Sequence, residues 1–168
     1  MNELNGYDIE DLEVGMTARF SKTITEADIV LFAGASGDNN AIHINEEFAS
    51  TTPFGGRIAH GFLTASTISA AIANRLPGPG TIYLSQSLRF TGPVRPGDTV
   101  HATVRVKEIH RAGSRAVLET VCSVRGAVVV EGEAVVKTTS ALRRAQAQQR
   151  AAAEEAQRGA APSAGAQQ

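Results

Sequence analysis

The sequence has one cysteine, no tryptophan and only 5% aromatic residues, and it carries no excess of either charge. Because Cys122 is alone, an intrachain disulfide is impossible, and its strand-like surroundings indicate a small buried side chain rather than a nucleophile. The 16 basic and 17 acidic residues leave a formal net charge of -1. This balance argues against a general nucleic-acid or membrane-surface binder, which would carry a basic excess.

Long apolar runs are also missing. No stretch approaches the roughly 18 consecutive apolar residues of a membrane span. The acidic N-terminal residues 1–15 lack the apolar segment of a signal peptide. We therefore expect a cytoplasmic protein with no membrane or nucleic-acid partner. A chain of 168 residues is long enough to fold as one domain without a disulfide or a metal.

Local signals in the first third of the chain predict short elements joined by loops. Weak alternation of apolar residues predicts a strand over 16–24. Thr25, with Asp28 three positions later, resembles a capping box and opens a predicted helix that Gly34 should end. A loop is then expected over 35–41, where Gly, Asp and Asn favour turn conformations.

The clearest helix is predicted over 60–75, where small and apolar residues go nearly all round and indicate burial on every side. Four strand-like runs follow, and the tight turns between the last three indicate an antiparallel sheet. One buried helix before consecutive strands is typical of an α+β fold in which the sheet wraps around the helix. The predicted strands are residues 81–90, 99–109, 116–124 and 127–136.

The composition changes near the C-terminus and divides the chain in two. Residues 1–140 form the predicted domain, and residues 141–168 form a tail dominated by Ala, Gln, Arg and Glu. Leu142 is the one large apolar residue of the tail, so the tail has no apolar stripe with which to dock on the domain. We expect a disordered segment or a frayed helix there.

Residues 36–43 and 56–62 carry the most distinctive chemistry. Asp38 and His43 lie five positions apart in a turn rich in Gly and Asn, and Gly61 stands where the central helix should begin. The simple interpretation is a local turn cap and a packed core histidine. The functional interpretation is that a carboxylate, an imidazole and a helix N-terminal N–H add water to an activated carbon–carbon double bond, or remove it.

Other chemistries fit the sequence less well. Residues 34–37 lack the Gly-x-Ser-x-Gly spacing of a nucleophile elbow. Residues 78–80 follow a helix rather than a strand, unlike a dinucleotide-binding loop. The four histidines show no paired metal-ligand spacing, so no metal site is predicted. We expect His101 and His110 at the surface of strands and His60 in a supporting role.

Taken together, these residues make the sequence resemble the MaoC-like hydratases of the hot-dog fold, specifically the (R)-specific enoyl-CoA hydratase family. The family pattern Gly-Asp-x-Asn-Pro-x-His, with Ala or Ser about six residues later, matches residues 37–43 and Ala49. Ala41 replaces the family proline, which loosens the loop backbone but removes no reactive group. The resemblance covers roughly residues 10–138 and leaves out the tail. It is carried further by residues 58–61, 82–90, 94–100 and 132–137.

The resemblance implies a fold, an assembly and a reaction. An antiparallel sheet wraps around a long central helix, two subunits form a homodimer or half of a dimer of dimers, and the pocket lies at their interface. Asp38 and His43 activate the water that adds to a trans-2-enoyl-CoA, and the Gly61 N–H holds the thioester oxygen. No cofactor is implied, because the CoA thioester is itself the substrate. The resemblance assigns supporting positions in the pocket to Asn40, His60 and Ser69.

Physical chemistry adds one expectation and leaves alternatives open. A dry pocket around Asp38 is favoured, because desolvation makes a carboxylate a stronger base. The substrate could instead be a carrier-protein-bound, branched or dicarboxylic acyl thioester acted on by a dehydratase, and a hot-dog thioesterase is a further option. Arg57, Arg89 and Arg95 either contact phosphates or a substrate carboxylate or are solvated surface charges. From a different class, a non-catalytic dimeric module could use the tail to recruit a partner.

Overall fold

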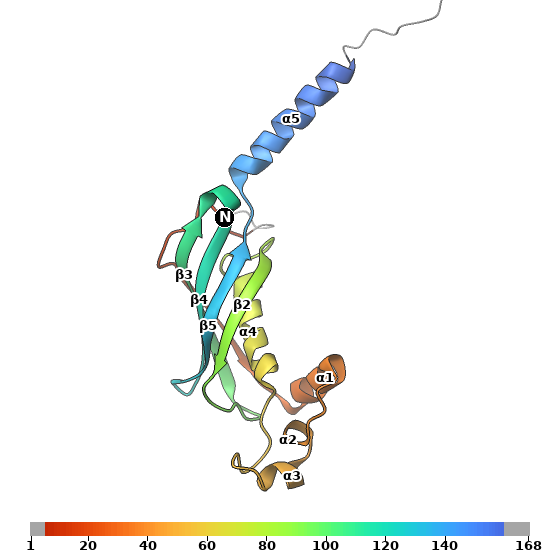
Figure 1. Cartoon of the computed structure of the whole chain (residues 1–168), viewed down its shortest axis with the longest axis vertical. Helices are drawn as coiled ribbons and strands as arrows, with labels where there is room; N and C mark the ends of the chain where they lie inside the picture. Colours follow the sequence, from red (N-terminus) through yellow and green to blue (C-terminus); the bar gives the residue numbers. More distant parts are fainter. Residues whose placement is uncertain (1–5, 160–168) are drawn as a thin grey trace, which may run out of the picture.

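A five-stranded antiparallel sheet lies against one long helix in the computed structural model, which describes residues 6–159 (Figure 1). This arrangement confirms the predicted α+β class, and every strand begins and ends within about one residue of its predicted range. The strands are β1 (Thr17–Thr23), β2 (Ile82–Phe90), β3 (Thr99–His110), β4 (Arg115–Val124) and β5 (Ala127–Lys137). The α-helices are α1 (Glu26–Ser36), α2 (Ala41–Ile44), α3 (Glu46–Ser50), α4 (Gly61–Asn74) and α5 (Ala141–Gly159).

The sheet has the strand order β1-β3-β4-β5-β2, so β1 and β2 form its two edges. Residues alternate between buried and less buried along most of β3 and β4, as expected for strands with one face on a core. Their buried side chains pack with α4 in one apolar cluster. Cys122 belongs to this cluster, and burial raises the pKa of its thiol. The prediction that this cysteine is a buried apolar side chain is therefore confirmed.

Helix α4 differs from its prediction on one side. The side chains toward the sheet, such as Leu63, Ile68 and Ile72, are buried. Four others lie at helical spacing and are exposed; we call them the open face of α4. The prediction of burial all round was wrong for this stripe, because the sheet of a single chain covers only one side of the helix. The open face consists of Phe62, Ser66, Ser69 and Ala73.

Helix α1 begins as predicted and ends later. The Asp28 N–H donates to Thr25 Oγ1 at 3.2 Å, and the Thr25 N–H donates to Asp28 Oδ2 at 2.8 Å, which completes the capping box. Gly34 does not end the helix. The helix ends at Gly37, whose left-handed φ of 78° lets its N–H reach the Ala33 carbonyl. A glycine costs some stability inside a helix but stops it only where the backbone turns left-handed.

Replacing Asp28 by alanine should lower the free energy of unfolding by about 1 kcal/mol at neutral pH, the usual effect of losing a helix cap. Hydrogen bonds from Thr25 and the nearby Lys22 ammonium lower the pKa of Asp28 from 3.8 to about 2. When a carboxyl group has a lower pKa in the folded than in the unfolded state, its ionised form stabilises the fold. This stabilisation is complete at pH values above the unfolded-state pKa, and it is lost as the pH falls through the folded-state pKa. The deficit of the variant should thus be constant above about pH 5 and shrink from about pH 4 toward pH 2. Urea unfolding of both proteins across this range checks the prediction, and a pH-independent deficit contradicts it.

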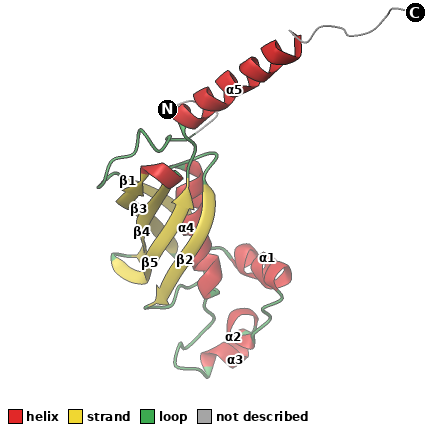
Figure 2. Cartoon of the chain, turned by 45° about the horizontal axis from the view of Figure 1, so that its top comes forward, coloured by secondary structure: helices red, strands yellow, loops and turns green. Residues whose placement is uncertain are grey.

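Between β1 and α4 the chain leaves the sheet as three helices, α1, α2 and α3 (residues 26–50), which we call the helical excursion. Figures 1 and 2 show α2 and α3 beyond one end of the sheet and α1 beside that end. Helix α2 falls at the end of the predicted loop 35–41 and was not predicted. Asn40 caps α2 and Asn45 caps α3, each with a side-chain oxygen that accepts a backbone N–H.

Helix α5 projects away from the sheet at the opposite end from the helical excursion (Figure 1). Its first turn is tied down by Arg144, whose guanidinium donates to both Asp8 carboxylate oxygens at 2.7 Å. Residues 141–155 are exposed, and residues 160–168 lie outside the described part, so the predicted fraying of the tail stays a prediction. Within residues 6–159, no helix combines the length and apolar character needed to cross a membrane.

Candidate active site

Asp38 lies directly after Gly37, in a turn held by its own neighbours. Its N–H donates to Ser36 Oγ at 3.1 Å, and its Oδ1 accepts the Asn40 N–H at 3.3 Å. These local bonds orient the carboxylate without burying it, since the Asp38 side chain is exposed. The dry surroundings expected for this carboxylate are therefore not provided by a single chain.

His43 lies on α2 and is buried, with 8% of its surface exposed. Its Nδ1 is 2.8 Å from the Ile58 carbonyl oxygen. Because a carbonyl only accepts hydrogen bonds, the hydrogen is assigned to Nδ1, and Nε2 is left free for chemistry. This bond joins the helical excursion to the segment that leads into α4.

His60 immediately precedes α4 and is almost completely buried. Its Nε2 donates to the Asp38 carbonyl at 3.0 Å, and its ring lies 3.9 Å from the His43 ring, with 32° between the two planes. The Phe32 ring packs against the His60 ring, with 4.9 Å between the two ring centroids. Nδ1 of His60 has no hydrogen-bond partner among the described residues. His60 thus contacts both predicted catalytic residues from the start of α4, which is a supporting position.

One ligand atom from each of Asp38, His43 and His60 lies within 4.8 Å of the other two. The sequence spacing did not predict this cluster, because His60 comes 17 positions after His43. An imidazole lone pair lies in the plane of its ring, so two rings stacked at 32° do not direct their lone pairs well toward one ion. The geometry suits proton transfer better than metal binding, and the absence of a metal stays a prediction.

Gly61 is the first residue of α4, and its backbone N–H has no acceptor among the described residues. A Cβ at this position would lie 2.8 Å from the Phe90 ring, so glycine allows that ring to approach the peptide. Gly61, at the positive end of the helix dipole, lines a cavity of about 410 Å³. His43, Gly61 and Thr64 line it together with apolar groups. The apolar lining comes from Phe54, Ile58, Ala59, Phe90, Pro93, Val94 and Val130.

Of the supporting residues assigned from the sequence, Asn40 lies next to the catalytic turn and Ser69 lies away from the cavity. Asn40 caps α2 through its side chain and holds the turn of Asp38 through its N–H. Ser69 does not line the cavity; it is exposed on the open face of α4, about 12 Å along the helix from Gly61 at 1.5 Å per residue. Its pocket role stays a prediction. Thr64 was missed, although a position one turn after Gly61 on the same helix was a usable signal.

The other polar residues singled out in the sequence lie elsewhere. His101 and His110 are on β3 and at least partly exposed, as predicted. Arg89 is exposed and 3.8 Å from Glu131, and Arg95 donates to the Phe54 carbonyl. Arg57 is not a solvated surface charge, because its guanidinium is paired with two glutamates.

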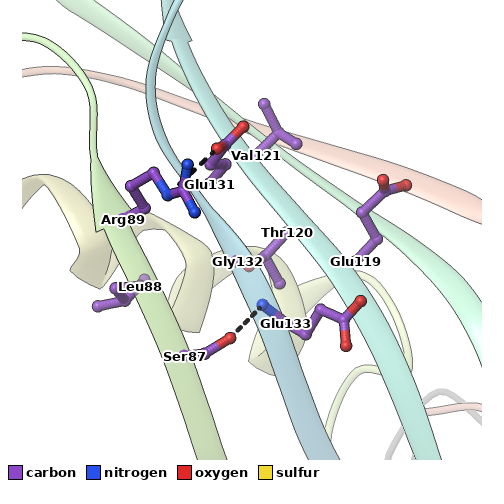
Figure 3. Close-up of a pocket in the computed structure, with 9 residues that line it drawn as sticks. All are labelled: Ser87, Leu88, Arg89, Glu119, Thr120, Val121, Glu131, Gly132 and Glu133. Carbon is purple, nitrogen blue, oxygen red and sulfur yellow. Dashed lines mark hydrogen bonds and ion pairs between the residues drawn. The ribbon is translucent and has the colours of Figure 1, made fainter.

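A second hollow, of about 370 Å³, lies over β2, β4 and β5 on the sheet (Figure 3). The ion pair between Arg89 and Glu131 crosses it, and the Glu133 N–H donates to Ser87 Oγ at 3.1 Å. These groups satisfy one another, and the hollow contains no histidine or helix N-terminus. The cavity beside Gly61 is therefore the better candidate for an active site.

Comparison with known proteins identifies the family of this chain. A family model for the MaoC-like domain matches residues 11–128. An (R)-specific enoyl-CoA hydratase of Rhodospirillum rubrum is 54% identical over 125 residues, covering 74% of this chain and 87% of the relative. A 3-hydroxybutyryl-CoA dehydratase of Methylorubrum extorquens is 52% identical over 133 residues, covering 79% and 85%.

The fold agrees with these sequence matches. The solved structure of the unliganded R-hydratase from Pseudomonas aeruginosa matches with a TM-score of 0.77 and 43% identity. The match covers 82% of this chain and 88% of that structure. The resemblance of the loop around Asp38 and His43 thus extends over most of the domain, and the chain belongs to the MaoC-like domain family with its hot-dog fold.

Proposed function

We propose that the protein is an (R)-specific enoyl-CoA hydratase, which adds water reversibly to a trans-2-enoyl-CoA and forms a (3R)-3-hydroxyacyl-CoA. The observation that carries this proposal is that Asp38 lies close to His43 and His60, while His43 and Gly61 at the start of α4 line one largely apolar cavity. The names of the two relatives describe the two directions of this kind of reaction, hydration of an enoyl-CoA and dehydration of a 3-hydroxyacyl-CoA.

In the proposed mechanism, Asp38 and His43 Nε2 hold one water molecule, and Asp38 acts as the base that takes one proton from it. The water oxygen forms a bond to C3 of the enoyl group while the double-bond electrons move toward the thioester carbonyl. A proton then reaches C2 on the same face, so that both parts of the water molecule are in the product. The Gly61 N–H stabilises the negative charge that develops on the thioester oxygen, and such a donor contributes roughly 10²–10³ in rate. The reverse path uses the same groups for dehydration.

The decisive experiment is the hydration of crotonyl-CoA by the full-length chain. Loss of absorbance of the conjugated thioester measures turnover, and chiral chromatography of the hydrolysed product identifies its configuration. We expect (3R)-3-hydroxybutyrate as the dominant enantiomer. A dominant (3S) product, or an unchanged conjugated thioester, contradicts the proposal.

The same assay separates the alternatives that the sequence leaves open. A thioesterase releases free CoA, which a thiol reagent detects, whereas a hydratase keeps the thioester bond intact. A dehydratase of carrier-protein-bound substrates would act faster on crotonyl-carrier protein than on crotonyl-CoA at equal concentration.

We propose that no cofactor takes part, because adding water to a double bond needs no external oxidant or reductant. The cytoplasmic location stays a prediction.

We also propose that two copies of the chain form the active unit. Strand β2 is an edge strand whose residues are largely exposed, and Phe90 at its end lies with its ring centroid 5.9 Å from that of Phe62 on the open face of α4. An uncovered strand edge beside exposed Phe62 and Phe90 is a surface that pairs with another chain. A second copy there would also exclude water from the region around Asp38, which one chain leaves exposed.

Sedimentation equilibrium tests this assembly. We expect a mass of twice the 17.6 kDa of the chain, or a multiple of that dimer, at the concentrations used for the assay. A monomeric mass in a preparation with full hydratase activity contradicts a shared pocket.

A further inference from the structure

We propose that Arg57 is a positioning residue, which holds the helical excursion, and with it Asp38 and His43, in register with the start of α4. This inference rests on the proposed hydratase function for its kinetic test. It gives this arginine a role that neither a solvated charge nor a substrate-binding charge would have.

The Arg57 guanidinium bridges two carboxylates from different helices. Its Nη1 and Nη2 each donate to one oxygen of Glu26 at 2.8 Å, and its Nε donates to Glu46 Oε2 at 2.9 Å. The backbone N–H of Arg57 also donates to Glu46 Oε2, at 3.3 Å. The side chain of Arg57 is 21% exposed, whereas those of Glu26 and Glu46 are 57% and 60% exposed. We call these three residues the Arg57 clamp.

The Arg57 clamp joins the three segments that build the active site. Glu26 is the first residue of α1, which ends just before Asp38. Glu46 is the first residue of α3, which follows the helix that carries His43. Arg57 itself is four positions before Gly61. One side chain therefore ties both ends of the helical excursion to the segment that presents the oxyanion donor.

Helices α2 and α3 lie beyond the end of the sheet (Figure 2), whereas α1 is anchored in the apolar core through Ile29. Near the reactive atoms three hydrogen bonds hold the excursion: two join α2 to Ile58, and one joins His60 to the Asp38 carbonyl. A shift of the excursion by about 1 Å would leave the fold intact but could lower the rate about 10²-fold, because proton transfer depends steeply on alignment. Exposed ion pairs add little to global stability, so the effect of the clamp should fall on catalysis.

Arginine suits this position better than lysine. A planar guanidinium donates along several fixed directions and can serve two carboxylates at once, whereas an ammonium has a single charged nitrogen. The hydrogen bond to Arg57 lowers the pKa of Glu46, and the two glutamates raise the pKa of Arg57. Arg57 and Glu46 therefore stay charged at every pH used for the assay, and removal of the Arg57 guanidinium should not change the shape of the pH profile.

The test compares Arg57→Lys and Arg57→Met with Arg105→Met, a matched control. Arg105 forms an exposed ion pair with Glu119 at 2.7 Å on the sheet, far from the excursion in sequence and in contacts. For crotonyl-CoA hydration we expect kcat to fall about tenfold or more in both Arg57 variants, with KM changed less than about threefold. The midpoint of thermal unfolding and the pH profile should be nearly unchanged. Arg105→Met should behave as the wild type.

Two readouts separate a failed clamp from a failed function. If Arg57 bound a phosphate or carboxylate of the substrate, its loss would raise KM and leave kcat near wild type, and the proposal would be overturned. Amide hydrogen exchange needs no substrate: Arg57→Met should speed exchange over residues 36–45 and leave the sheet strands unchanged. Unchanged exchange there overturns the clamp even if the wild-type chain proves not to hydrate crotonyl-CoA.

A double-mutant cycle with Glu26→Gln adds a specific check. If the two residues act through one contact, the double variant Glu26→Gln/Arg57→Met should be no slower than Arg57→Met alone. Additive losses in kcat would show that Arg57 acts in some other way and would remove the clamp as the cause.

Discussion

Replacing Asp38 by asparagine should lower kcat for crotonyl-CoA hydration by roughly 10²–10⁴, the usual contribution of positioned acid–base catalysis. Asparagine has the shape of aspartate and keeps a side-chain oxygen that can accept the Asn40 N–H, so the turn should persist. It cannot take a proton from water. We therefore expect a loss of rate with an unchanged circular dichroism spectrum and unfolding midpoint.

A suitable control is Glu47→Gln, which removes an exposed carboxylate from the same helical excursion. This variant should retain nearly full activity, because Glu47 does not belong to the cluster of Asp38, His43 and His60. Turnover of Asp38→Asn within about tenfold of wild type, well short of the loss expected for a catalytic base, would remove this carboxylate from the mechanism.

The second large effect is expected at His43. Asparagine at this position places its amide nitrogen near the location of Nδ1, so it can still donate to the Ile58 carbonyl, but it has no group in place of Nε2. His43→Asn should therefore lower kcat by about 10² or more while preserving the link between α2 and the segment before α4. Steady-state kinetics with crotonyl-CoA, alongside thermal unfolding, measures both parts of this expectation.

The two substitutions together test whether the residues act as a unit. Groups that share one proton transfer show strongly non-additive losses, so the double variant should be little slower than the more damaged single variant. A product of the two single losses, by contrast, would mean that Asp38 and His43 serve independent steps.

Several parts of the fold could be predicted because they depend on neighbours in the sequence. The capping box needs only Thr25 and Asp28, which are three positions apart and bond to each other. The strands were placed closely because alternation of apolar residues follows directly from the two-residue period of a strand. The loop with Asp38 and His43 was identifiable because its residue types and spacing match a family pattern.

Predictions failed where one local sequence pattern is compatible with two different structures. Gly34 and Gly37 are both glycines in or near α1, and the backbone turned left-handed at the second one only. Helix α4 is apolar on nearly all sides, but a single sheet covers one side, so Phe62 and the rest of the open face remain exposed. Arg57 carries the same charge as Arg89, and only the positions of Glu26 and Glu46 distinguish an arginine that bridges two carboxylates from an exposed one that lies near a single carboxylate.

The local amino-acid pattern was enough to predict most of the elements and the loop that carries the reactive carboxylate and imidazole. Hydrogen bonds and apolar periodicity over a few residues are properties of the local chain, so they can be read without a structure. Three features depend on how distant segments pack: the His60 ring lies against His43, His43 and Gly61 line one cavity, and Arg57 joins α1 to α3. These contacts join segments 11 to 31 residues apart, and their geometry follows from how the sheet, α4 and the helical excursion pack together.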